Sequence, residues 1–103
     1  MDANTTPRKA IAVLRIEIRG GNDEVDMRAL GARLGYAVDA HLVAIDADRE
    51  GPLATVATAL ARTGADTVIV PDLEHIDGID HHIRQRAQII TVAGERVIER
   101  AAA

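Results

Sequence analysis

The 103-residue chain contains no cysteine and no serine. Without cysteine there are no disulfides, thiolate metal ligands or cysteine nucleophiles, and without serine no mechanism can use a serine hydroxyl as its nucleophile. Phenylalanine and tryptophan are absent as well, and Tyr36 is the single tyrosine. No stretch reaches the roughly 18 consecutive apolar residues of a membrane helix, so we expect a cytoplasmic protein that makes no membrane contact.

Charge is distributed unevenly along the chain, whose formal net charge is -4. Residues 21–83 are strongly acidic, whereas both ends are mildly basic. An acidic middle repels a phosphate backbone, and the chain has neither a basic stripe nor a set of aromatic rings on which bases could stack. We therefore expect no direct binding to nucleic acid.

Strand-like and helix-like patterns alternate along the sequence. Apolar and branched runs predict strands over 10–18, 36–46, 66–70, 88–92 and 96–99. Apolar residues at helical spacing predict one helix from Asn22-Asp23 to Gly35, a second from Pro52 to Gly64, and a third that carries Ile76, Ile79 and Ile83. This alternation predicts a three-layer α/β fold, with a mainly parallel sheet of four to five strands, one antiparallel edge strand and helices on both faces.

The length fits one domain. We expect a flexible leader over residues 1–9, a single α/β domain over 10–100 and a frayed tail over 101–103. The leader is polar and lacks the apolar core of a signal peptide.

Ligand sites of parallel sheets form in the loops at the carboxyl ends of the strands. The polar residues that follow the first three predicted strands are Arg15, Glu17, Arg19, Asp46, Asp48, Arg49, Asp72, Glu74, His75 and Asp77. The Gly20-Gly21 pair has neither the glycine spacing of a dinucleotide site nor the lysine of a P-loop, so we interpret it as a plain turn.

Carboxylates and imidazoles are concentrated in residues 72–82. A metal site would need three or four of these groups to converge, and the best set would comprise Asp46, Asp48, Asp72, Glu74 and His75. The plainer interpretation is a solvated acidic loop that runs into a helix capped by Asp77, because the adjacent His81 and His82 must point in different directions. We favour that interpretation and expect no metal or cofactor. His41 is expected to be a packed or half-exposed strand residue.

Three short stretches resemble the N-terminal catalytic domain of the serine recombinases, the resolvase and invertase family. Ile11-Ala-Val-Leu-Arg-Ile-Glu17 is similar to the family pattern I-G-Y-A-R-V-S, and Arg49-Glu-Gly-Pro-Leu53 is similar to its Arg-Pro-Gly-Leu stretch. Val70-Pro-Asp-Leu-Glu-His-Ile-Asp-Gly78 is similar to V-x-K-L-D-R-L-G-R. The resemblance implies a resolvase-like fold over most of the chain.

The departures from the family patterns bear on the chemistry. Glu17 stands where the family has its nucleophilic serine, and His75 and Gly78 stand where it has arginines. A carboxylate at the nucleophile position repels the phosphate that the family attacks. No segment matches the family's long connecting helix and helix-turn-helix. The resemblance thus implies a relic anion pocket, made of Arg15, Glu17, Arg49, Glu74 and His75, without strand-transfer activity.

These observations support two hypotheses of different classes. The first is a catalytically inactive resolvase-like domain that acts as a protein-interaction or regulatory module, with self-association and an unidentified protein partner expected. In it Arg15 either forms a buried pair with Glu17 or belongs to the relic pocket. The alternative is a small metal-dependent hydrolase or nucleotide-binding enzyme that uses the strand-end carboxylates and His75. A weaker variant of the first hypothesis makes the chain a regulatory subunit of an active recombinase.

Overall fold

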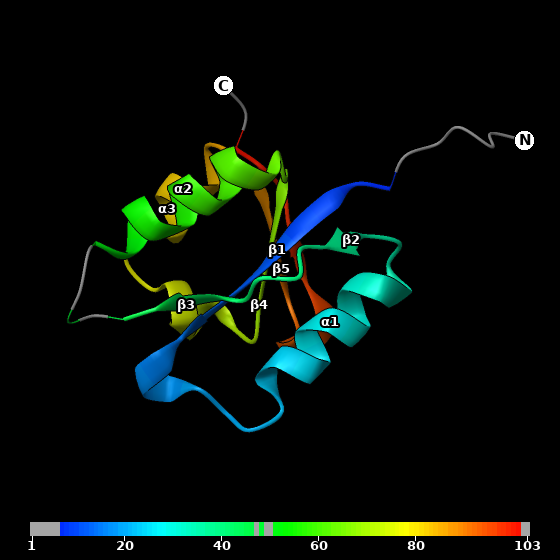
Figure 1. Cartoon of the computed structure of the whole chain (residues 1–103), viewed down its shortest axis with the longest axis horizontal. Helices are drawn as coiled ribbons and strands as arrows, with labels where there is room; N and C mark the ends of the chain where they lie inside the picture. Colours follow the sequence, from blue (N-terminus) through cyan, green and yellow to red (C-terminus); the bar gives the residue numbers. More distant parts are fainter. Residues whose placement is uncertain (1–6, 47, 49–50, 102–103) are drawn as a thin grey trace, which may run out of the picture.

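The computed structural model describes residues 7–46, 48 and 51–101 (Figure 1). Short strands and helices follow one another along the chain. In order they are β1 (Lys9–Arg15), η1 (Ile16–Ile18), α1 (Asp23–Arg33), β2 (Ala37–Val38), β3 (Val43–Ile45), α2 (Pro52–Thr63), β4 (Thr67–Val70), η2 (Leu73–Ile76), α3 (Asp80–Arg84), β5 (Gln88–Thr91), η3 (Ala93–Glu95) and β6 (Val97–Ile98).

The strands form one mixed sheet in the order β2-β1-β4-β5-β6, and β3 also pairs with β1. Every strand pair is parallel except β5 with β6, which is antiparallel. The prediction of a mainly parallel sheet with one antiparallel edge strand is therefore confirmed. The sheet has six strands because the predicted strand over 36–46 is divided into two.

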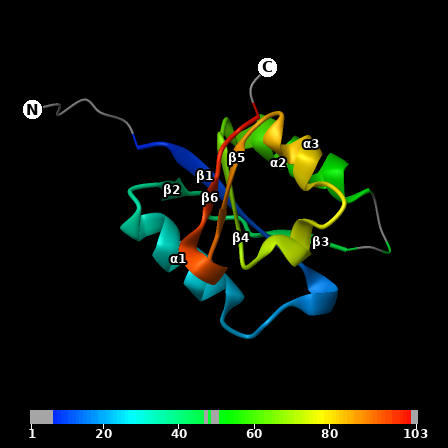
Figure 2. The same cartoon turned by 180° about the vertical axis from the view of Figure 1, so that it is seen from behind.

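Helices cover both faces of this sheet, as Figures 1 and 2 show from opposite sides. On one face, Met27 and Leu30 of α1 pack against alternate residues of β1. On the other face, Val56 and Leu60 of α2 and Ile83 of α3 pack against the remaining β1 residues and their neighbours in β4 and β5. Within the described ranges, no helix has the length and apolar character needed to cross a membrane.

The strand predicted over 36–46 is broken by an insertion. Val38 lies opposite Ala10 and Val43 lies opposite Val13, so residues 39–42 face only two residues of β1. The extra backbone bulges outward, and the guanidinium of Arg28 donates hydrogen bonds to the carbonyl oxygens of Asp39 at 2.8 Å and Ala40 at 2.9 Å. The bulge therefore receives from a side chain the hydrogen bonds that it cannot make in the sheet.

Two predictions about individual residues on these loops were wrong. His41, expected in a packed strand, lies in the bulge with 81% of its side chain exposed. Asp77 does not cap the third helix, because α3 begins three residues later and Ile79 occupies the N-cap position. Gly78, with a φ of +87°, turns the chain between η2 and α3 and separates Asp77 from the helix.

The ends of some elements also differ from the sequence-based expectations. β1 begins at Lys9, inside the expected leader, and ends at Arg15, because Ile16–Ile18 form the turn η1. The third helix is only five residues long. At the other end, the backbone N–H of Ala101 donates to the carbonyl oxygen of Arg84, so the first residue of the expected tail is attached to α3.

Gly31 provides a test of the packing between α1 and the sheet. A Cβ at this position would lie 2.9 Å from Ile69 Cδ1 and closer still to Val38. We expect Gly31→Ala to lower the free energy of unfolding by up to about 2 kcal/mol, because the cost of overpacking, about 1–3 kcal/mol, exceeds the gain of about 1 kcal/mol in helix propensity.

Urea unfolding followed by circular dichroism measures this effect. Gly21→Ala is the control, because no atom lies within 4 Å of its Cβ position. Equal stability of the Gly31→Ala and Gly21→Ala variants would show that α1 does not approach the sheet this closely.

Candidate functional site

Two of the predicted site residues, Arg15 and His75, meet at the carboxyl ends of β1 and β4. His75 lies on η2, directly after β4, and is only 3% exposed. The backbone N–H of Arg15, at the end of β1, donates to His75 Nδ1 at 2.8 Å. Since Nδ1 accepts this bond, the ring hydrogen lies on Nε2, which is 3.8 Å from Asp23 Oδ2 at the start of α1. The buried side chain of His75 therefore links η2 to the end of β1 and to the start of α1.

The side chain of Arg15 is also held by the loop after β4. One terminal nitrogen donates a long hydrogen bond, 3.4 Å, to the carbonyl oxygen of Asp77. Its Nε is buried and, among the described residues, has no hydrogen-bond partner. The Arg15 side chain thus contacts backbone of the loop between β4 and α3, and Glu17, expected as its buried partner, is exposed on η1. The expected buried pair of Arg15 with Glu17 is therefore wrong.

The other predicted site residues lie around this point without converging on it. Glu74 is exposed on η2, and Asp72 accepts a hydrogen bond from the backbone N–H of Glu74 at 2.8 Å. Asp46 follows β3, next to the end of β1, and accepts one from the backbone N–H of Asp48 at 2.9 Å. Arg49 lies outside the described residues.

Metal binding has no geometric support in the part of the chain that the structure describes. No group of three histidine, aspartate or glutamate residues there lies close enough together to hold an ion. The short turns formed by Asp46 and Asp72 use their carboxylates to hold backbone N–H groups of their own loops.

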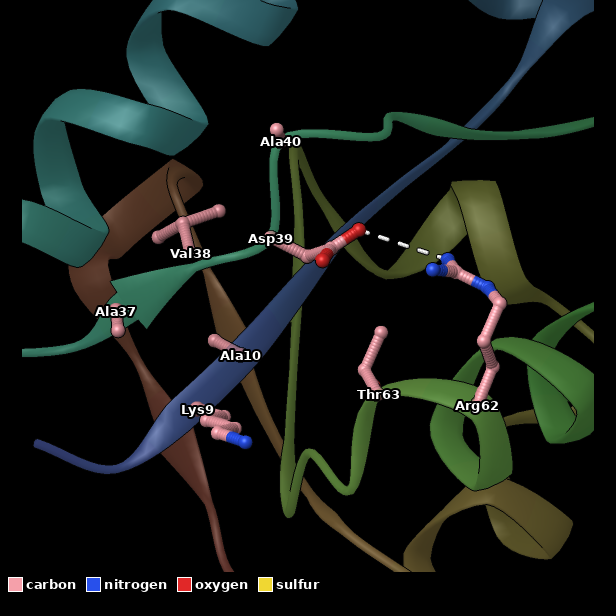
Figure 3. Close-up of a pocket in the computed structure, with 8 residues that line it drawn as sticks. All are labelled: Lys9, Ala10, Ala37, Val38, Asp39, Ala40, Arg62 and Thr63. Carbon is pink, nitrogen blue, oxygen red and sulfur yellow. Dashed lines mark hydrogen bonds and ion pairs between the residues drawn. The ribbon is translucent and has the colours of Figure 1, made fainter.

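A cavity of about 340 Å³ lies elsewhere, between the start of β1, the bulge after β2 and the end of α2 (Figure 3). Its apolar walls come from small side chains of β2, the bulge and the end of α2. Its charged groups are Lys9, Asp39 and Arg62. In Figure 3 the Asp39 carboxylate extends across β1 toward Arg62. The cavity lies where the bulge begins, and Asp39 and Ala40 of the bulge are part of its lining.

The Asp39 carboxylate is fixed in this cavity by two partners. Its Oδ2 accepts hydrogen bonds from the backbone N–H of His41 at 3.1 Å and from Arg62 at 3.5 Å. The bond from the His41 backbone, together with the charge of Arg62, lowers the pKa of Asp39 below its ordinary value. Asp39 is therefore ionised at neutral pH.

The sequence-based reasoning did not find this cavity, although one signal was present. In a continuous strand over 36–46, the polar Asp39 and His41 would share a face with Val43 and Ile45, which are core residues. That conflict indicates a change of register between the two pairs. The branched and apolar content of the segment nevertheless favours one continuous strand.

Comparisons of the chain with protein-family models, with curated proteins and with solved structures found no match.

The His75 link can be tested by two substitutions. His75→Ala leaves the buried N–H of Arg15 without an acceptor and removes a packed ring, so we expect the free energy of unfolding to fall by about 2–4 kcal/mol. His75→Asn places an oxygen where Nδ1 lies, and we expect it to recover about 1 kcal/mol of that loss.

Urea unfolding of both variants gives the comparison, with His81→Ala as a control at an exposed histidine. If His75→Asn were no more stable than His75→Ala, the hydrogen bond from Arg15 would contribute nothing to stability.

Proposed function

We propose that this chain is a non-catalytic protein-interaction module with a recombinase-like fold, and that it self-associates through a surface at the carboxyl end of β1. The strand order, with one antiparallel edge strand, is compatible with the fold that the sequence motifs imply. The absence of serine removes the family's nucleophile, and the position that corresponds to it holds the exposed Glu17.

The residues that would bind phosphate support a non-catalytic function. In a recombinase, arginines stabilise the charge that develops on the attacked phosphate. Here His75 is buried and hydrogen-bonded to backbone, and Arg15 contacts the carbonyl oxygen of Asp77. Neither side chain is arranged to hold an anion from solvent.

The observation that carries the proposal is the apolar surface beside them. Ile16 and Ile18 on η1 are 48% and 37% exposed, and Val25 on the first turn of α1 is 68% exposed. An ion pair of 3.8 Å between Arg19 and Glu24 ties the two segments together. We call this surface, Ile16, Ile18, Arg19, Glu24 and Val25, the η1 patch. In parallel α/β folds this edge carries ligand-binding loops, but here it presents exposed branched side chains that suit a protein partner.

The charges of the η1 patch favour a second copy of the chain as that partner. The patch carries one cation and one anion on its two segments. A two-fold axis that lies in the interface at right angles to the line from Arg19 to Glu24 brings the cation of each copy toward the anion of the other, around an apolar centre.

Val25→Asp tests this surface with little risk to folding. The residue is exposed, and a carboxylate in the first turn of a helix is favourable for the helix dipole. We expect the wild-type chain to form dimers at micromolar concentration and the variant to bind itself at least about tenfold more weakly, since a charge would be buried at the interface.

Sedimentation equilibrium measures both constants. Leu34→Lys is the matched control, because it places a favourable charge at the other end of α1 on an exposed apolar residue. A wild-type chain that stays monomeric, or an unchanged dimer in Val25→Asp, would refute self-association through the η1 patch.

The same proposal predicts behaviour toward DNA. The net charge of -4 and the missing nucleophile lead us to expect neither retention of duplex DNA at about 150 mM salt nor nicking of a supercoiled plasmid. Filter binding and plasmid relaxation assays measure the two outcomes. Salt-sensitive retention would contradict the first expectation and nicked product the second.

A further inference from the structure

The cavity beside the bulge has the size and composition of a small-ligand site. Its volume of about 340 Å³ lies within the range of about 300–1,000 Å³ that is usual for such sites. Ala37 and Thr63 contribute small side chains to its apolar walls, whereas the side chains of Ala10 and Val38 pack beneath α1, and no aromatic ring lines it. A ligand with a short aliphatic group fits these walls, whereas a nucleobase would find no ring on which to stack.

The walls are held in place before any ligand arrives. Arg28 fixes the backbone on one side of the bulge through the carbonyl oxygens of Asp39 and Ala40, and Arg28 is itself held by Glu24 at 3.1 Å. On the cavity side, Arg62 and the backbone of His41 fix the Asp39 carboxylate. A site that is already ordered loses little conformational entropy on binding.

Two groups at the cavity remain open to a ligand. Both hydrogen bonds to the Asp39 carboxylate go to Oδ2, and Oδ1 accepts none from the described residues. The side chain of Lys9, the only lysine of the chain, makes no ion pair or hydrogen bond within the part of the chain that the structure describes. The cavity therefore offers one uncompensated cation and one free carboxylate oxygen.

We propose that this cavity binds a small α-amino acid with a short aliphatic side chain. Its carboxylate would meet the ammonium of Lys9, its ammonium would meet Asp39 Oδ1, and its side chain would contact the apolar walls. A simple carboxylate would leave Asp39 Oδ1 unpaired, and a simple amine would leave Lys9 unpaired. A zwitterion satisfies both groups.

Titration of the isotope-labelled chain with L-alanine and L-valine, followed by NMR, tests the proposal. We expect saturable shifts at Lys9, Asp39 and Arg62, with the Lys9 Nζ signal as a single-site reporter because the chain has no other lysine. Propionate, lactate and propylamine serve as probes that lack the ammonium or the carboxylate. Each should bind at least about tenfold more weakly than the amino acids.

Two variants assign the binding to this cavity. Lys9→Gln and Asp39→Asn should each weaken amino-acid binding at least about tenfold, and Asn at position 39 keeps an acceptor for the His41 backbone. Arg8→Gln is the matched control, since it removes a neighbouring cation that pairs with Asp66 outside the cavity lining. Melting curves of all three variants show that they remain folded.

Three results would overturn the proposal. The first is the absence of saturable shifts up to about 10 mM amino acid. The second is equal affinity for lactate or propionate, which would show that Asp39 does not recognise the ammonium. The third is unchanged affinity in folded Lys9→Gln, which would place the binding elsewhere.

Discussion

Strand β1 is the constraint on which the rest of the structure depends. It pairs with β2 and β3 along one edge and with β4 along the other, and residues Ala10–Leu14 are completely buried between α1 and α2. A strand enclosed in this way must find a partner for each of its backbone groups inside the protein, because water cannot reach them. The contact between Arg15 and His75 and the bulge beside the cavity both lie where strand pairing does not supply those partners.

At the carboxyl end of β1, pairing with β4 stops before Arg15. The backbone N–H of Arg15 therefore donates to a side chain instead of to a strand. His75 accepts the Arg15 N–H and draws the loop after β4 over the end of the sheet. The edge at which parallel α/β folds usually bind ligands is thereby closed by the protein's own groups. What remains outside is the η1 patch, whose branched side chains are exposed.

Near the start of β1 the sheet is open instead of closed, because the cavity lies beside the change of register between β2 and β3. Two inserted residues move the chain away from the sheet, and Arg28 and Arg62 hold the displaced backbone and the Asp39 carboxylate from two sides. The sheet thus has an internally bonded carboxyl end and a preformed cavity near its amino end.

Local chemistry in the sequence was sufficient to predict some parts of this structure. As expected, α2 begins at Pro52 and ends before Gly64, because proline favours a first helical position and Gly64 adopts the left-handed conformation that ends the helix. The alternation of strand and helix patterns likewise predicted the antiparallel edge strand, which is β6, and the mainly parallel sheet. The meeting of Arg15 and His75 followed from their places at the ends of adjacent parallel strands.

The remaining features depend on contacts between residues that are distant in the sequence. The strand is broken at residues 39–42 because Val38 pairs with Ala10 and Val43 pairs with Val13, which leaves four residues opposite two. The sequence of the segment does not indicate which residues of β1 it pairs with. His41 was therefore misplaced and the cavity was missed. The sequence alone determined the order of the elements, the sheet type and the absence of cysteine and serine, since each is encoded by local spacing or composition. Only the tertiary structure decided which polar groups form hydrogen bonds within the protein and which have no partner there. The reason is that the register of the strands determines which groups lie within hydrogen-bond distance of each other.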